Sequence, residues 1–320
     1  MSAPIHILSL GAGVQSSTLA LMAEAGEVTP MPTAAVFADT QAEPASVYKW
    51  LDWLIGRLSF PVNKVTRGSL SAVSLKIRAH QSKPGKFWSK SLIPAYVANP
   101  DGTKGIMGRA CTADHKIAPL IARARALAGA AAIKAWRKRH SKAHGVWSAW
   151  KREAATARRD RLPLPRFPSE AWDEMQADAL VVQWIGISLD EVQRMKPARD
   201  PWIRHRWPLI ELEMKRHDCL RWMEARGYPK PPRSACVYCP FHNDHEWRRL
   251  RDQEPAEFER AVQFERDLQD VKRRSDNLGG VPFLHASLKP LDQVDFATDA
   301  ERGQSLLAGF GNECEGMCGT

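Results

Sequence analysis

A short segment near the N-terminus, rich in glycine and serine, has the composition of an anion-binding loop. Gly11 and Gly13 follow an apolar run at 4–10, and Ser16 and Ser17 open an apolar stretch with a helical pattern. Glycines let the backbone approach a ligand closely, and the N–H groups at the start of a helix attract negative charge. The loop therefore predicts a phosphate site. A tight strand-to-helix turn with a serine cap is the alternative.

Cysteine is the other residue type whose spacing points to chemistry. Six cysteines lie in the later two thirds of the chain, at Cys111, Cys219, Cys236, Cys239, Cys314 and Cys318. In a reducing compartment, such a set serves metal, cluster or redox chemistry more often than structural disulfides. The pair Cys236 and Cys239 fits structural zinc, an iron–sulfur cluster or a redox dithiol. Cys219 lies beside Leu220 and Trp222 in a helical pattern, which predicts a buried core cysteine.

The last two cysteines belong to the segment Glu313-Cys314-Glu315-Gly316-Met317-Cys318. Neighbouring carboxylates raise the pKa of a thiol and weaken it as a nucleophile, unless a basic phosphate pocket offsets them. Three interpretations stay open: a nucleophile with a resolving partner, two ligands that join Cys236 and Cys239 in a four-thiolate metal site, and an inert tail.

Positive charge is concentrated in one segment. The net charge is +10, and residues 121–166 hold 13 of the 46 basic but only 2 of the 36 acidic residues. Trp136, Trp147 and Trp150 are interleaved with these cations. Cations attract phosphates and indoles stack on unpaired bases, so the segment predicts a surface for single-stranded nucleic acid, in tRNA or DNA. The alternative is a solvated basic helix pair whose tryptophans pack on the main domain.

The elements that must position these residues follow from apolar runs. Runs at 4–10, 34–38, 62–65 and 179–188 predict strands, and helical patterns follow the first two. Strands that alternate with helices predict an α/β fold with a doubly wound parallel sheet.

We expect a nucleotide-binding α/β domain at 1–120 and 176–242, a basic, Trp-rich helical insertion at 121–175, and a helical C-terminal extension at 243–320. No uncharged apolar run approaches the ~18 residues of a membrane span. The N-terminus also lacks the pattern of a signal peptide, so we expect a cytoplasmic protein with no membrane partner.

Several motifs resemble the adenine nucleotide alpha-hydrolase superfamily, whose phosphate-binding segment is called the PP-loop. The loop with Gly11 and Gly13 is similar to that segment, and Gln15 stands where the ATP-cleaving branch has an aspartate. Glutamine here is closer to the phosphoadenosine phosphosulfate (PAPS) reductase branch. Further matching segments follow in that family's order: Phe37-Ala38-Asp39-Thr40, Arg109 to Leu120, Gly186-Ile187-Ser188 with Asp190, Glu191 and Arg194, Trp207 to Ile210, Asp218, Gly227-Tyr228-Pro229, and Cys236 to Pro240. The resemblance covers most of residues 4–120 and 180–241.

The resemblance implies a site for an adenine nucleotide, either PAPS or ATP, with Mg²⁺ if ATP is used. The expected nucleotide-binding residues are Ser9, Gly11, Gly13, Gln15, Ser16, Ser17, Phe37, Asp39, Thr40, Lys116, Gly186, Arg194 and Arg206. Cys111, Cys236 and Cys239 match three of the four ligands of the family's [4Fe-4S] cluster. Three ligands leave one iron open, unless Cys219 is the fourth. Zn²⁺ is the alternative metal.

The resemblance implies an enzyme, an oxidoreductase or a sulfurtransferase. In sulfonucleotide reduction, Cys314 would attack the sulfur of the bound nucleotide, with Cys318 as its resolving partner and a thiol reductant protein to regenerate both. The first alternative is ATP-dependent sulfur transfer to tRNA or DNA, assisted by a cluster on Cys111, Cys236 and Cys239. The second is a zinc-stabilised nucleic-acid-binding protein without catalysis.

Overall fold

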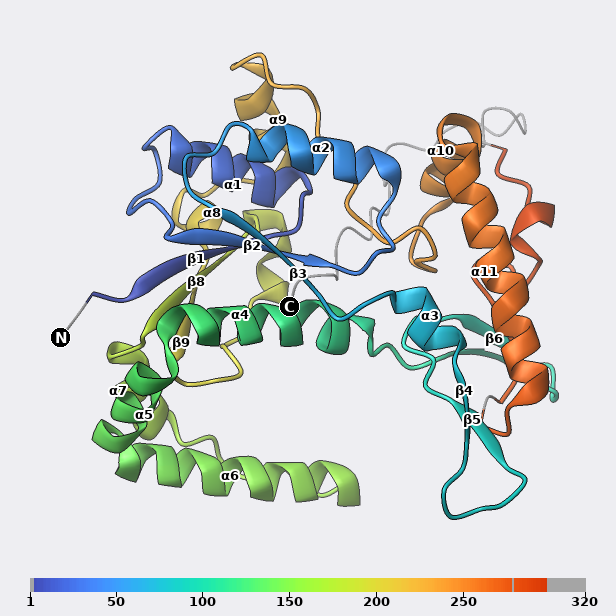
Figure 1. The fold of residues 1–320 in the computed structure, drawn as a ribbon, viewed down its shortest axis with the longest axis horizontal. Coiled ribbons are helices and arrows are strands. Elements are labelled where there is room, and N and C mark those ends of the chain that lie inside the picture. The colour runs from blue at the N-terminus through green and yellow to red at the C-terminus, as the bar shows by residue number, and fades with distance from the viewer. Residues whose placement is uncertain (1–2, 278, 298–320) are drawn as a thin grey trace. The chain divides into compact units, whose positions relative to one another are not determined.

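The computed structural model describes residues 3–277 and 279–297, which form two compact units (Figure 1). Unit 1 takes the described residues of 1–37, 53–65 and 120–231, and unit 2 takes those of 38–52, 66–119 and 232–320.

A five-stranded parallel sheet in the order β3-β2-β1-β8-β9 forms the centre of unit 1. Its strands are β1 (Ile5–Leu10), β2 (Ala34–Asp39), β3 (Val62–Thr66), β8 (Val181–Ile185) and β9 (Ile203–Arg206). Leu10 pairs with Phe37, and Ser9 pairs with Ile185, so the carboxyl ends of β1, β2 and β8 meet at one edge of the sheet. In open parallel sheets this edge is where ligands bind.

Helices cover both faces of the sheet, with α1 and α9 on one side and α4 on the other (Figure 1). The helical segments of unit 1 are α1 (Val14–Glu24), α4 (Ala118–Ala128), α5 (Ala130–Arg139), α6 (Ser141–Asp160), α7 (Ser169–Ala177), the 3-10 helix η2 (Leu189–Arg194), α8 (Pro208–Glu211) and α9 (Arg216–Glu224). The predicted α/β architecture with a parallel sheet is confirmed, and the arrangement is Rossmann-like.

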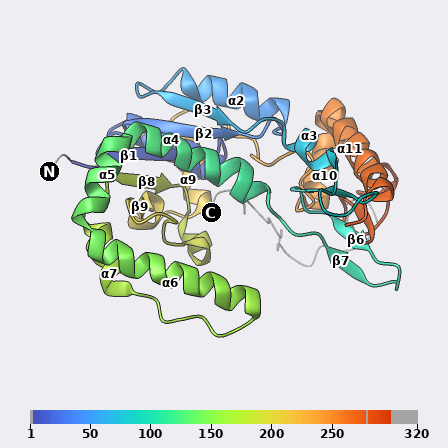
Figure 2. The ribbon, with the colours of Figure 1, turned by 60° about the horizontal axis from the view of Figure 1, so that its bottom comes forward.

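The basic segment after α4 is part of the core of unit 1. Trp136 of α5 and Trp147 of α6 are 0% and 7% exposed, and they belong to the same apolar cluster as Ile7 and Val181 of the sheet. Helix α6 also packs against α7 (Figure 2). The two indoles therefore stabilise the unit as core side chains.

Unit 2 combines small antiparallel sheets with helices. Its elements are α3 (Leu70–Leu75), the pair β4 (Ile77–Ala79) and β5 (Phe87–Ser89), the sheet β10 (Val281–Phe283), β6 (Tyr96–Ala98) and β7 (Lys104–Ile106), the π-helix η1 (Thr112–Ile117), α10 (Asp244–Gln253), α11 (Pro255–Arg274) and η3 (Leu291–Gln293). Helix α2 (Ala45–Ile55) begins in unit 2 and ends in unit 1.

The core of unit 2 joins segments that the sequence had assigned to different domains. Leu92 and Tyr238 pack in one cluster with Trp247 of α10 and Phe264 of α11. The buried carboxylate of Glu265 accepts backbone N–H groups at 2.6 and 2.8 Å, which fixes the segment after β10 against α11. Residues 66–119 and 232–242 therefore group with the C-terminal helices, whereas the expected domain boundaries placed them with the parallel sheet.

Candidate functional site

The loop between β1 and α1 has the geometry of a tight strand-to-helix connection. Ala12 adopts a positive φ of 57°, and Gly13 is the N-cap of α1 in an extended conformation. The Gly11 N–H donates to Ser16 Oγ at 3.1 Å, and the Ser17 N–H donates to Gly13 O at 3.0 Å. Ser16 and Ser17 are buried, as expected for the first turn of a helix packed on a sheet.

Gly186, directly after β8, lets this loop approach the sheet. A Cβ added at Gly186 would lie 2.9 Å from Ser16 N, 3.0 Å from Ser16 Cα and 3.2 Å from Gln15 C. All three are backbone atoms, which no side-chain rotation can move away. Glycine at this position is therefore required for the observed path of the loop.

Gln15 is held by polar groups from two other segments of unit 1. Its Nε2 donates to Ser188 Oγ at 3.4 Å and to Glu191 Oε2 at 3.3 Å, while Arg216 donates to its Oε1 at 3.3 Å. Burial raises the pKa of the Glu191 carboxyl, although Arg194, which pairs with it, opposes the shift. The predicted residues Gln15, Gly186 and Arg194 thus lie at one end of the sheet.

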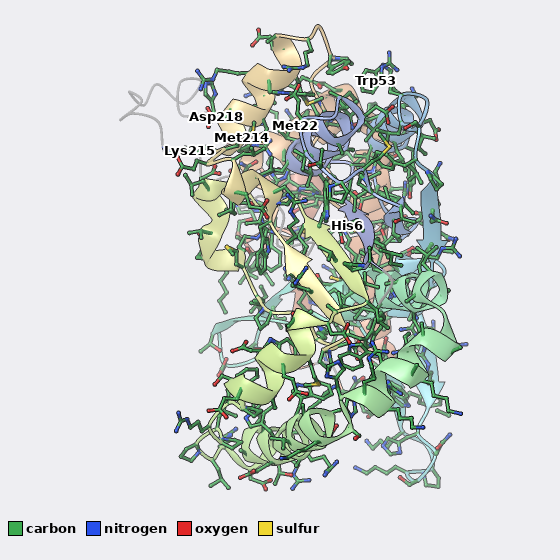
Figure 3. The ribbon with its side chains drawn as sticks, turned by 90° about the vertical axis from the view of Figure 1, so that its left-hand side faces the viewer. His6, Met22, Trp53, Met214, Lys215 and Asp218 are labelled. Atoms are coloured by element: carbon green, nitrogen blue, oxygen red, sulfur yellow. The ribbon has the colours of Figure 1, made fainter. Side chains whose placement is uncertain are left out.

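The start of α9 fixes the backbone of Arg216. The Lys215 N–H donates to Asp218 Oδ2 at 2.8 Å and the Arg216 N–H donates to Asp190 Oδ1 at 3.1 Å. Figure 3 shows Met214, Lys215 and Asp218 together at this turn. The sequence analysis did not identify Arg216 as a site residue, because its contact with Gln15 joins two segments that are 201 residues apart.

Two other predicted residues of unit 1 have protein partners. Ser9 Oγ accepts from Gln183 Nε2 at 2.8 Å. Arg206 binds both carboxylate oxygens of Glu211, at 2.7 to 3.1 Å, and its guanidinium lies 4.8 Å from the ring centroid of Trp184. A phosphate at Arg206 would have to compete with this bidentate ion pair.

In unit 2, the predicted residue Asp39 accepts a hydrogen bond from Tyr48 Oη at 2.7 Å and one from the Gln41 N–H at 2.8 Å. Burial, followed by this bond to Asp39, raises the pKa of Tyr48. Phe37, which belongs to unit 1, is 2% exposed.

A buried carboxylate, Glu43, organises the other predicted residues of unit 2. Its Oε1 lies 3.3 Å from Lys116 Nζ and 3.9 Å from Cys236 Sγ, and its Oε2 accepts from Ser234 Oγ at 3.5 Å. Cys236 Sγ also lies 3.5 Å from Thr40 Oγ1. Glu43 is 1% exposed, so Lys116 compensates a charge that would otherwise be buried without a counterion.

The three expected metal ligands all border the core of unit 2. Cys236 belongs to its apolar cluster, and Cys111 and Cys239 pack against it. Among the described residues, however, no three His, Cys, Asp or Glu side chains form a group that could hold a metal ion. The present arrangement does not fit a closed metal centre, and the cluster and zinc stay predictions.

Two buried histidines flank these cysteines along the chain. His242 Nε2 lies 3.0 Å from Cys236 O, which can only accept, so Nε2 carries the proton. His115 lies in the π-helix after Cys111 and is 4% exposed, and within the described chain neither of its ring nitrogens has a hydrogen-bond partner. The sequence analysis missed both His242 and Glu43: the spacing Cys-x-x-Cys-x-x-His is a signal that could have identified His242, whereas no spacing marks Glu43.

The remaining cysteines have separate places. Cys219, in α9 of unit 1, is fully buried, and burial raises its pKa to about 12, as expected for a core cysteine. Cys314 and Cys318 lie outside the described residues.

Comparisons with known proteins give no match: no family model, no curated protein and no solved structure resembles the chain significantly. Within the described parts of the chain, no helix is both long and apolar enough to span a membrane.

Proposed function

We propose that the chain is an enzyme of the PAPS reductase type, which binds an adenine nucleotide at the loop of residues 9–17 and uses cysteine thiols for sulfur chemistry. The observation that carries this proposal is the fit of the loop against Gly186. A helix N-terminus at the carboxyl edge of a parallel sheet supplies N–H groups for an anion. The loop packs so closely on Gly186 that a side chain there would collide with the Ser16 backbone.

The partners of Gln15 favour a nucleotide that is not cleaved with metal assistance. Gln15 offers an amide where the ATP-cleaving branch offers a carboxylate, and it is linked to Arg216 and Glu191. An amide is a poor ligand for Mg²⁺ compared with a carboxylate. In this proposal the sulfuryl group of PAPS is transferred to a thiolate without the help of a metal ion. PAPS is therefore favoured over ATP as the substrate.

The proposed reaction uses two thiolates. Cys314 attacks the sulfur of PAPS, the bond from sulfur to the nucleotide phosphate breaks, and adenosine 3′,5′-bisphosphate leaves. The Cys318 thiolate then attacks Cys314 Sγ, sulfite leaves with the electron pair, and a disulfide forms. A thiol reductant protein reduces this disulfide and completes the cycle.

Titration calorimetry with PAPS, ATP and GTP, each with and without Mg²⁺, tests the site. We expect PAPS to bind more tightly than ATP, with no Mg²⁺ requirement, and GTP to bind weakly. Sulfite release from PAPS with a dithiol reductant tests the chemistry, and Cys314→Ser should abolish it. Absence of adenine nucleotide binding would refute the site, whereas binding with an unaffected Cys314→Ser rate would refute only the nucleophile.

ATP-dependent sulfur transfer to tRNA or DNA is the second candidate. The exposed cations of 121–166 favour it, because a nucleic-acid substrate needs phosphate contacts beyond the loop. Tight, Mg²⁺-dependent binding of ATP without binding of PAPS would favour this function over sulfonucleotide reduction.

A further inference from the structure

The long helix α6 presents positive charge that its own unit does not neutralise. Its buried positions are Ala143, Trp147, Ala154 and Ala157, and together with the half-buried Trp150 they recur every three to four residues and form one stripe toward the core. Its five Lys and Arg side chains are exposed and lie outside this stripe, at Lys142, Lys151, Arg152, Arg158 and Arg159.

Most cations in this segment have no acidic partner among the described residues. Arg139 pairs with Asp178, and Arg159 pairs with Asp160. Eight others are exposed and make no ion pair or hydrogen bond to an acidic side chain within the described chain: Lys134, Arg137, Lys138, Lys142, Arg152, Arg158, Arg161 and Arg166. Such an excess at neutral pH attracts a polyanion.

Aromatic side chains of the same segment are already engaged. The indoles of Trp136 and Trp147 are in the core of unit 1. Trp150 is half-buried, its Nε1 donates to Pro165 O at 3.1 Å, and its ring meets Phe167 edge-on at a centroid distance of 4.9 Å. Single-strand binding relies on stacking between bases and exposed rings. Only Phe167, which is 39% exposed, and the half-buried Trp150 present part of a ring to solvent, so the exposed cations dominate this surface.

We infer that the outer surface of α5 and α6 binds the phosphate backbone of a double-stranded nucleic acid, without reading its sequence. Helix α6 has 20 residues and so spans about 30 Å, over which it holds its cations on a rigid rod. A duplex offers one phosphate charge per ~1.7 Å of its axis, a higher density than a single strand. The inference is independent of the nucleotide loop, because it uses none of the residues of that site.

Charge alone would also attract an anionic membrane. A helix that lies on a membrane inserts an apolar face into the lipid, and the apolar stripe of α6 faces the core instead. Leu162 and Leu164, which follow α6, are 59% and 54% exposed. Vesicles are therefore included in the test as a competing target.

The test compares two full-length variants that each lose four exposed cations. The patch variant carries Lys134→Ala, Lys138→Ala, Arg152→Ala and Arg158→Ala. The control variant carries Lys49→Ala, Lys83→Ala, Lys230→Ala and Lys289→Ala, which are exposed elsewhere on the chain. Both lose the same charge, so a general electrostatic effect would weaken both equally. Circular dichroism and thermal melting verify that each variant folds like the natural chain.

Fluorescence anisotropy then measures binding of a 20-base-pair duplex RNA, a duplex DNA of the same sequence and the corresponding single strands, between about 50 and 200 mM salt. We expect the duplexes to bind more tightly than the single strands. The slope of log K against log salt should become shallower by about 0.9 for each patch cation that contacts a phosphate. The control variant should keep the natural slope, and a difference between the two duplexes would identify the preferred helix geometry.

Three results would overturn the inference. Tighter binding of single strands than of duplexes would indicate that the bases stack on aromatic side chains of this segment. Equal slopes for the patch and control variants would place the contacts elsewhere. Binding to vesicles of anionic lipid without binding to either duplex would assign the surface to a membrane.

Discussion

The alanine substitution at Gly186 tests whether the loop of residues 9–17 is the phosphate site. The added Cβ would lie 2.9 Å from Ser16 N, whereas ordinary contact begins near 3.4 Å, so the loop must withdraw by at least about 0.5 Å. Forced displacement in a packed region costs ~1–3 kcal/mol. If the nucleotide binds only the loop conformation of the natural chain, the free energy of binding is weakened by the same amount, so the affinity falls about 5- to 150-fold.

Calorimetry with PAPS and ATP measures this loss. Gly145→Ala is the matched control, because Gly145 lies within α6 and the added Cβ has no described atom within 4 Å other than those of its chain neighbours and of its own helix backbone. That control should melt at the natural temperature or slightly higher, since alanine is favoured over glycine in a helix by ~1 kcal/mol, and it should bind nucleotide normally.

A folded Gly186→Ala protein with unchanged affinity for both nucleotides would show that the reasoning is wrong. If this variant does not fold, Gln15→Ala gives the same test, since it removes contacts to Glu191 and Arg216 without adding an atom to the packed region. It should weaken binding while it leaves the melting temperature nearly unchanged.

Three further predictions concern the cysteines and the pH dependence of folding. Because burial raises the pKa of Cys219 to about 12, native protein at pH 8 should alkylate this thiol about a thousandfold more slowly than an ordinary one; labelling as fast as in urea would contradict its core position. The described side chains form no closed metal centre, so the cluster is a prediction of the sequence alone: if it holds, protein purified without oxygen contains iron and absorbs near 400 nm, and Cys236→Ser loses both; stoichiometric zinc without colour would contradict the cluster. Burial lowers the pKa of His205, so the unfolded chain takes up the proton first and stability is lost as the pH falls below about 6.5. Urea unfolding at pH 7 and pH 5 measures this loss: His205→Gln should lose less unfolding free energy than the natural chain, and the difference should be a fraction of the ~1.4 kcal/mol per pH unit that one full proton contributes. The same dependence of unfolding free energy on pH in both proteins would contradict the lowered pKa.

The parallel sheet and its first loop follow from local sequence signals. Apolar runs of strand length lead to β1, β2 and β8, because burial on both faces of a parallel strand leaves a continuous apolar run, and the helical pattern after the first run leads to α1. The contacts that define the loop are not local. Gly186 meets Ser16 across 170 residues, and Arg216 meets Gln15 across 201. A single sequence gives no signal for such pairs.

Unit 2 was harder to predict for the same physical reason. Its strands have three residues each, too short for an alternating pattern, and they pair in small antiparallel sheets. Its core depends on packing between 66–119 and the helices α10 and α11, so the boundaries drawn from composition divided it. Glu43 illustrates the limit: nothing in its neighbours along the chain marks it as a buried carboxylate, because its counterion, Lys116, is 73 residues away.

The tryptophans of the basic segment show how one pattern can serve two purposes. An interleaving of indoles and cations fits a single-strand surface, yet it also fits a helix whose indoles face a core and whose cations face water. The positions decide between them: Ala143, Trp147, Trp150, Ala154 and Ala157 recur every three to four residues, which is one face of a helix. The cations occupy the other faces. Trp136 and Trp147 therefore hold α5 and α6 in the core of unit 1. The cations of these helices form a rigid surface, so a partner must match a fixed arrangement of positive charges.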